Sequence, residues 1–203
     1  MLLLKKTAGI ILAAGESKRM GSTKQLLPFQ GSTMLGQVIS QVRQSLLYER
    51  IVVLGHDADR IMNDVSFADM NIIINHDYKK GQNSSLIKGL SLVSPECRAA
   101  MFFLADQPLI TTAIINRLLT AFESGENTGA AFVIPFYKGH RGNPVIAARK
   151  IFPELERLNS DTGARTLFKK YENEILKVDI EDEGILFDID TPEDYDIVFQ
   201  RKE

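Results

Sequence analysis

Apolar residues occur along the chain in short runs, separated by stretches of helical spacing. Several runs are apolar at successive positions, which is typical of strands that are covered on both faces. Strands that face water on one side would instead alternate between apolar and polar residues. The runs predict strands at residues 8–12, 50–54, 71–75, 100–105, 130–134, 144–147 and 174–179.

The stretches between these runs have the spacing of amphipathic helices. In residues 33–47, for example, Leu35, Val38 and Val42 repeat at intervals of three and four. "TPE" at residues 191–193 supplies an N-cap, a first-turn proline and an early acid. Helices are predicted at residues 33–47, 57–66, 84–94, 111–124, 163–171 and 192–200. The alternation of strands and helices predicts an α/β fold with a doubly wound, mostly parallel sheet, built as one domain over residues 1–203.

Residues 136–162 interrupt this alternation. They begin with "FYKGHRGNPV", which is rich in glycine and polar residues and contains a proline. We expect an excursion that returns through an antiparallel strand. Such insertions often carry substrate contacts.

Composition narrows the choice of partners. The formal net charge of the 203 residues is −2, so no overall field favours nucleic acid or an anionic membrane surface. An anion must therefore be held by a local group of cations. Cys97 is the single cysteine, which rules out an intrachain disulfide, and the N-terminal residues do not resemble a secretory signal. We expect a cytoplasmic protein without a membrane segment.

The loop that follows the first predicted strand reads "AAGESKRMGSTKQLLP", residues 13–28. In open α/β sheets ligands bind beyond the carboxyl ends of the strands. Gly15 and Gly21 would let backbone N–H groups approach an anion, and Arg19 and Lys24 could neutralise phosphate oxygens. The spacing matches neither the dinucleotide fingerprint G-x-G-x-x-G nor the Walker A loop. A surface loop with incidental charge is the alternative.

Two acidic residues favour phosphate chemistry over that alternative. Asp106 directly follows the predicted strand 100–105, and Asp190 precedes the predicted helix 192–200. Each could be a helix cap. Two carboxylates at predicted strand ends, beside a candidate phosphate loop, suit Mg²⁺, which binds through one or two carboxylates together with substrate phosphates. Asp188 lies two residues before Asp190 and is either an accessory group or structural.

The first loop resembles the signature L-A-A-G-x-S-x-R-M-G-x-x-K of the nucleotidyltransferases, from Leu12 to Lys24. Within that superfamily the chain is similar to the molybdenum-cofactor cytidylyltransferases and to the related purine-catabolism accessory proteins of bacteria. Further matching stretches are "GQNSSLIKGL" at 81–90, "DQPLI" at 106–110, "RGNPV" at 141–145, "DTGAR" at 161–165 and "DIDTPEDY" at 188–195. The chain departs from the common pattern at Gln82, where methionine is frequent, and at Asn143, where histidine is frequent.

The resemblance implies a Rossmann-like nucleotidyltransferase fold and a Mg²⁺-dependent reaction. CTP and molybdopterin would give the cytosine dinucleotide cofactor and pyrophosphate. Guanylyltransferases of this group typically read L-A-G-G, so Ala14 favours CTP. Two alternatives stay open. One is the same chemistry with GTP or with a sugar-phosphate acceptor. The other is a non-catalytic nucleotide-binding protein that helps to mature a molybdenum hydroxylase such as xanthine dehydrogenase.

The residue interpretation and the resemblance together give three sets of candidate site residues. The catalytic candidates are Arg19, Lys24, Asp106 and Asp190, of which the two aspartates would hold the metal. The candidates for nucleotide binding are Leu12, Ala13, Ala14, Gly15, Arg19, Lys24, Gly81, Ser84 and Ser85. The candidates for acceptor binding are His140, Arg141, Asn143, Asp161 and Arg165. For His140 and Arg141 the alternative is a polar hairpin tip, and for Asp161 and Arg165 it is helix capping with a local ion pair.

Overall fold

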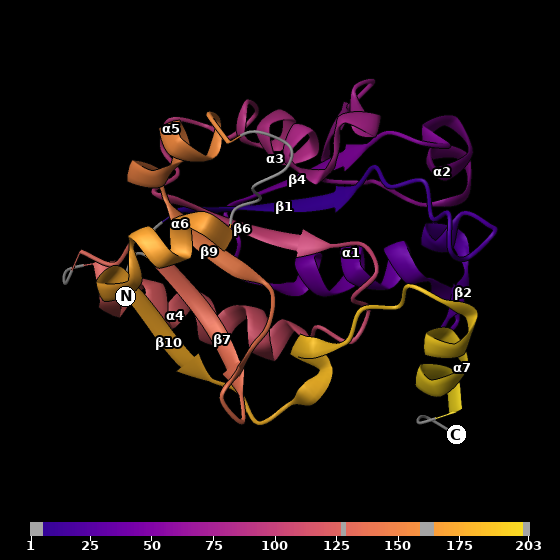
Figure 1. Cartoon of the computed structure of the whole chain (residues 1–203). Helices are drawn as coiled ribbons and strands as arrows, with labels where there is room; N and C mark the ends of the chain where they lie inside the picture. Colours follow the sequence, from indigo (N-terminus) through magenta and orange to yellow (C-terminus); the bar gives the residue numbers. More distant parts are fainter. Residues whose placement is uncertain (1–5, 127–128, 159–164, 201–203) are drawn as a thin grey trace.

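The computed structural model describes residues 6–126, 129–158 and 165–200. Its main sheet has the strand order β10-β7-β9-β6-β1-β4-β5, and β8 pairs with β7 outside this path (Figure 1). The strands are β1 (Thr7–Ala13), β4 (Glu49–Leu54), β5 (Asn71–Ile74), β6 (Ala99–Leu104), β7 (Phe132–Tyr137), β8 (His140–Arg141), β9 (Val145–Ala148) and β10 (Ile175–Asp179). A separate hairpin joins β2 (Pro28–Phe29) and β3 (Ser32–Thr33).

The sheet is mostly parallel. Strand β1 pairs in parallel with β4 and β6, β4 pairs in parallel with β5, and β7 pairs in parallel with β10. Strand β9 runs antiparallel to both of its neighbours, β6 and β7. The expected antiparallel return within residues 136–162 is therefore confirmed, and it lies inside the sheet rather than at an edge.

Helices cover both faces of the sheet (Figure 1). They are α1 (Met34–Gln44), α2 (Ala58–Asp64), α3 (Gln82–Leu90), α4 (Thr112–Glu126), α5 (Phe152–Leu155), α6 (Arg165–Lys170) and α7 (Pro192–Gln200). Short 3₁₀ turns lie at Lys24–Leu26, Tyr78–Lys80, Arg149–Ile151, Glu172–Glu174 and Glu183–Leu186. No helix in the described part of the chain is long and apolar enough to cross a membrane.

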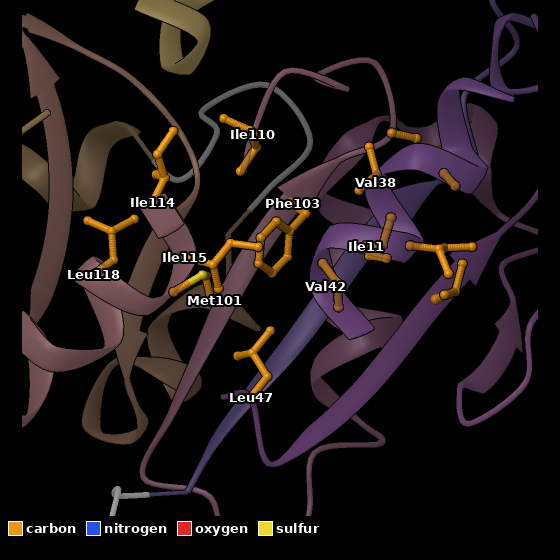
Figure 2. Packing of buried hydrophobic residues seen from close by; sticks show 14 of the residues in the cluster. Ile11, Val38, Val42, Leu47, Met101, Phe103, Ile110, Ile114, Ile115 and Leu118 are labelled. Atoms are coloured by element: carbon orange, nitrogen blue, oxygen red, sulfur yellow. The ribbon is translucent and has the colours of Figure 1, made fainter. Parts of the chain in front are cut away.

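Two buried clusters account for these layers. On one face, residues of α1, α2 and α4 pack against β1, β4 and β6, and Figure 2 shows part of this packing, with Ile11, Val42 and Phe103 among the labelled side chains. On the other face, residues of α3, α5 and α6 pack against the same strands and against β7. Strand β1 lies in the middle and is buried on both sides, as its unbroken apolar run predicts.

A third, smaller cluster joins the β2–β3 hairpin and the start of α1 to the C-terminal segment. Phe29 of the hairpin, Met34 of α1, and Ile189 and Val198 near the C-terminus are all buried against one another. The hydroxyl of Tyr195 in α7 donates a hydrogen bond of 2.5 Å to the carbonyl of Pro28. This cluster, which we call the hairpin–α7 cluster, fixes residues 188–190 beside the loop that follows β1.

Candidate active site

The side chain of Lys24 lies between two aspartates that come from distant parts of the chain. Its ammonium nitrogen is 2.5 Å from Oδ2 of Asp106 and 2.9 Å from Oδ1 of Asp190. Asp106 follows β6, and Asp190 precedes α7. The structure therefore brings together three of the residues that the sequence singled out, at the carboxyl ends of the parallel strands.

The ion pairs shift the pKa values of Lys24 and Asp190 in the directions that keep both groups charged. Burial of the Lys24 ammonium acts to lower its pKa, but the charge of Asp106 and hydrogen bonds to both carboxylates outweigh it and hold the pKa above its usual range. Burial acts to raise the pKa of Asp190, but Lys24 and Arg19 outweigh this and keep it below its ordinary value. Arg19 is mostly exposed and donates to Oδ2 of Asp190 at 2.7 Å. All four catalytic candidates thus form one ion-pair network.

Asp188 lies close to this network without pairing to Lys24. It accepts a hydrogen bond of 2.5 Å from the side-chain amide of Gln107. Partial withdrawal of the Asp188 carboxyl from water raises its pKa, and the negative charge of Asp106 raises it further. The carbonyl oxygen Oε1 of Gln107 is buried and has no hydrogen-bond partner among the described residues. No pattern in the sequence singles out Gln107.

Gln25 organises the loop after β1, although the sequence analysis missed it. Its side chain is almost fully buried, and its amide nitrogen donates to the carbonyls of Ala13, at 3.2 Å, and Gly15, at 3.1 Å. Its carbonyl oxygen accepts from the hydroxyl of Ser17 at 3.2 Å. The position directly after Lys24, within the loop that the sequence predicts to hold phosphates, is the signal that could have found it.

The start of α3 lies beside this loop and carries the other nucleotide-binding candidates. Gly81 has a φ of 100°, a conformation that favours glycine, and α3 begins at the next residue. The hydroxyl of Ser84 donates to the carbonyl of Gly81, and the amide of the buried Asn75 donates to the hydroxyls of Ser84 and Ser85. These bonds fix the first turn of α3 against the end of β5.

Two adjoining clefts open beside the ion-pair network. The smaller cleft has a volume of about 200 Å³ and is lined by Leu12, Ala14, Gly15, Lys24, Gln25, Tyr78, Gln82, Ser85, Leu104 and Asp106. Ala13 lies behind it as the acceptor of a bond from Gln25. Four of the nucleotide-binding candidates lie outside the lining, namely Ala13, Arg19, Gly81 and Ser84.

The larger cleft has a volume of about 330 Å³ and shares Leu12, Gln82 and Leu104 with the smaller one. Its walls are mostly apolar, and its polar lining residues are Gln82, Asn83, Gln107, Arg141, Asn143 and Asp188. The guanidinium carbon of Arg141 lies 4.6 Å from the centre of the Phe168 ring, which also lines the cleft.

The acceptor-binding candidates do not all lie at the larger cleft. Arg141 and Asn143 line the larger cleft, whereas His140 is exposed in β8 and lies outside the lining. Asp161 lies outside the described residues. Arg165 is the first residue of α6, and its side chain also lies outside what the structure describes.

A sequence profile of the MobA-like NTP transferase domain matches residues 9–175, most of the chain. The chain belongs to this family. Among its curated relatives are the molybdenum cofactor cytidylyltransferase of Escherichia coli, 28% identical over 92% of each chain, and the purine catabolism protein PucB of Bacillus subtilis, 28% identical over 94% of each. Another is the nicotine blue oxidoreductase of Paenarthrobacter nicotinovorans, 27% identical over 91% of this chain and 92% of the relative.

Solved structures of similar proteins agree with the fold. The crystal structure of a Mycobacterium sp. strain JC1 homologue of Rv0371c superposes with a TM-score of 0.86 at 28% identity and covers 98% of each chain. The Rv0371c protein of Mycobacterium tuberculosis, solved in complex with manganese, gives a TM-score of 0.82 at 25% identity and covers 96% of this chain and 98% of its own. The family assignment confirms the resemblance inferred from the signature, and the Rossmann-like nucleotidyltransferase fold is confirmed with it.

The residues of this MobA-like domain fit a divalent cation bound in part by substrate. Oδ1 of Asp106 is buried and has no hydrogen-bond partner among the described residues, which leaves one strong oxygen ligand unused. Within the described chain, no group of three or more His, Cys, Asp or Glu residues could hold a metal ion by itself. Two carboxylates with phosphate oxygens and waters make a typical Mg²⁺ site.

Proposed function

We propose that this chain is a Mg²⁺-dependent nucleotidyltransferase that transfers CMP from CTP to the terminal phosphate of molybdopterin and releases pyrophosphate. The observation that carries the proposal is the position of Lys24 between Asp106 and Asp190, with Lys24 and Asp106 lining the smaller cleft and the larger cleft adjoining it. A site for joining two phosphates needs such a combination of fixed cation, metal-binding carboxylates and two adjoining substrate pockets.

Asp106 and Asp190 would hold the metal ion. A divalent cation bound there would neutralise charge on the phosphates of the nucleotide. The unused Oδ1 of Asp106 and the partly exposed carboxylate of Asp190 support this assignment. Phosphate oxygens arriving with the nucleotide would draw Lys24 and Arg19 away from the carboxylates, because phosphate carries the larger charge.

The reaction itself requires positioning and charge stabilisation. An oxygen of the acceptor's phosphate attacks the α-phosphorus of the nucleotide, the new P–O bond forms, and the bond to the bridging oxygen of pyrophosphate breaks with its electron pair on the leaving group. Lys24, held protonated by its two carboxylates, would stabilise the charge that develops there. Arg19, on the exposed side of the loop, would contact the outer phosphates as a planar fork.

The two clefts suit two different substrates. The smaller one lies beside the loop after β1 and would take the nucleotide, with Lys24, Ser85 and Tyr78 among its lining residues. The larger one combines apolar walls with amide side chains, the Asp188 carboxyl group and the Arg141 guanidinium, which suits a flat heterocycle bearing several hydrogen-bonding groups and a phosphate. A pterin with a phosphate tail has this chemistry. The choice of CTP follows from Ala14 in the first motif and from the similarity to a cytidylyltransferase.

The test is pyrophosphate release in the presence of Mg²⁺, with CTP, GTP or ATP, each with and without molybdopterin. We expect release with CTP only when molybdopterin is present. Release with GTP, or with a sugar phosphate in place of molybdopterin, would favour the alternative substrates. Nucleotide binding without release in any mixture would favour a non-catalytic accessory protein. A redox activity alone, the class named for the P. nicotinovorans relative, would contradict the proposal.

A further inference from the structure

The buried side chain of Gln25 contacts three parts of the loop after β1. Its two amide hydrogens face two carbonyls, those of Ala13 and Gly15, and its oxygen faces the hydroxyl of Ser17. An amide side chain has two donors on nitrogen and an acceptor on oxygen, so this arrangement uses both ends of it. A carboxylate or an aliphatic side chain of the same length could not replace it.

We propose that Gln25 is the positioning residue for the nucleotide's phosphates. By binding the carbonyls of Ala13 and Gly15, it fixes the direction in which the loop presents its N–H groups to those phosphates. The inference rests on the proposed function, because it assigns a role in that reaction, and it adds a residue that does not itself touch the reacting atoms.

The geometry of the peptide bond determines where the N–H groups of the loop point. In a trans peptide, the C=O of one residue and the N–H of the next lie in one plane and point in opposite directions. Because the carbonyls of Ala13 and Gly15 point to Gln25, the N–H groups of Ala14 and Glu16 point away from it. A Cβ added to Gly15 would meet no atom within 4 Å, so the loop faces open space there. Backbone N–H groups held in a fixed direction beside open space can bind an anion, so this part of the loop is a candidate anion-binding nest.

The second step connects the loop to the catalytic cation. Ser17 has a φ of 54°, which a residue with a side chain rarely adopts. Its hydroxyl donates to Gln25 and accepts the backbone N–H of Lys24 at 3.3 Å. Gln25 therefore stabilises an unfavourable backbone conformation and, through Ser17, holds the backbone of Lys24 in register with the loop. The Gln25 side chain therefore fixes both the N–H groups of the loop and the backbone position of Lys24.

Three amides of the free protein report on the loop without any substrate. The N–H of Met20 donates to the carbonyl of Ser17, that of His56 to the carbonyl of Ala14, and that of Lys24 to the hydroxyl of Ser17. In Gln25→Met, which loses all three side-chain hydrogen bonds, we expect hydrogen exchange at these amides to speed up by about tenfold or more. Amides of the core helix α1 should not change. Gln25→Glu, which keeps the acceptor but loses both donors, should behave like Gln25→Met.

Steady-state kinetics separate positioning from a merely structural role. We expect Gln25→Met and Gln25→Glu to raise KM for CTP about tenfold and to lower kcat about a hundredfold, the order seen when reacting groups shift by about 1 Å. KM for the acceptor should not change. Gln44→Glu, at an exposed position in α1, is the matched control and should match the wild type.

Each outcome decides the inference. Loss of active protein would lower kcat and leave KM for CTP unchanged, and that result would assign Gln25 to folding alone. Unchanged exchange at Met20, His56 and Lys24 would show that Gln25 does not hold the loop. If the wild type releases no pyrophosphate, the proposed function fails, and the exchange experiment still decides whether Gln25 fixes the loop. If Gln25→Met does not fold, Gln25→Glu and Ser17→Ala supply the same comparison.

Discussion

Lys24 pairs with two carboxylates that are 82 and 166 residues away along the chain. Only 13% of its side chain is exposed, so little water screens its charge from the two carboxylates. Its two partners repel each other in its absence. This residue therefore affects both the local charge balance and the proposed chemistry.

Lys24→Ala should reduce nucleotidyl transfer by about 10²–10³-fold, as expected for loss of one preorganised electrostatic group. Affinity for the nucleotide should fall too, since the same ammonium would meet the phosphates. Pyrophosphate release and calorimetric binding of CTP measure the two effects. Lys88→Ala, which removes an exposed cation from α3, serves as the control. Normal affinity and rate in Lys24→Ala would remove this residue from the site.

Asp190 makes a pH-dependent contribution to stability whose direction follows from its lowered pKa. A carboxyl with a lower pKa in the folded than in the unfolded state stabilises the fold above its unfolded value of about 3.9, and the contribution disappears as pH falls through the folded value. Asp190→Asn should therefore be less stable than the wild type at about pH 7, and the difference should shrink below about pH 4. Urea unfolding at both pH values measures it. A difference that persists in acid would show that charge pairing with Lys24 and Arg19 is not its source.

Sequence patterns locate Asp106, Asp190, Lys24 and Arg19 because charged residues at the carboxyl ends of strands are conspicuous. They do not locate Gln25 or Gln107, since a buried amide has no periodic signal and its value depends on which carbonyls or carboxylates face it. Likewise, the sequence groups His140 with Arg141, yet only Arg141 lines the larger cleft. Neighbours in a short strand such as β8 point to opposite sides, and the sequence does not say which side faces the cleft.

At the scale of elements, the unbroken apolar runs predict the central strands well. Most of the observed strand ends lie one to three residues from the predicted ends. The hairpin β2-β3 and helix α5 are missed because elements of two to four residues give no measurable periodicity. Strand order is also missed: β9 pairs between β6 and β7, and this depends on packing between segments far apart in the chain.

The hairpin–α7 cluster is the element-level support of Asp190. Val198→Ala removes two buried methyl groups from it, and we expect a loss of about 1–2 kcal/mol in the free energy of unfolding. Because Asp190 lies two residues before α7, nucleotidyl transfer should fall more than the folded fraction does. Chemical unfolding and pyrophosphate release measure the two quantities. Ile197→Ala, at an exposed position of the same helix, is the control, and equal losses in both variants would contradict the assignment.

At the scale of the whole molecule, the metal should matter for activity and not for folding. Within the described residues no cluster of three acidic, histidine or cysteine ligands exists, so a divalent ion has too few protein ligands to stabilise the fold. Removal of divalent ions with EDTA should abolish pyrophosphate release and leave the thermal unfolding midpoint unchanged. Added Mg²⁺ or Mn²⁺ should restore release. A large drop in the midpoint with EDTA would point to a structural metal instead.

The reversed direction of β9 has a consequence for how such a protein can change. The parallel strands present their last residues to the edge of the sheet that holds the candidate site, whereas β9 presents its first. The segment before β9, residues 138–144, includes β8 and contributes Arg141, Gly142 and Asn143 to the larger cleft. The smaller cleft takes nothing from this segment. A swap of seven residues could therefore redesign the recognition of one substrate while the machinery for the other is inherited intact.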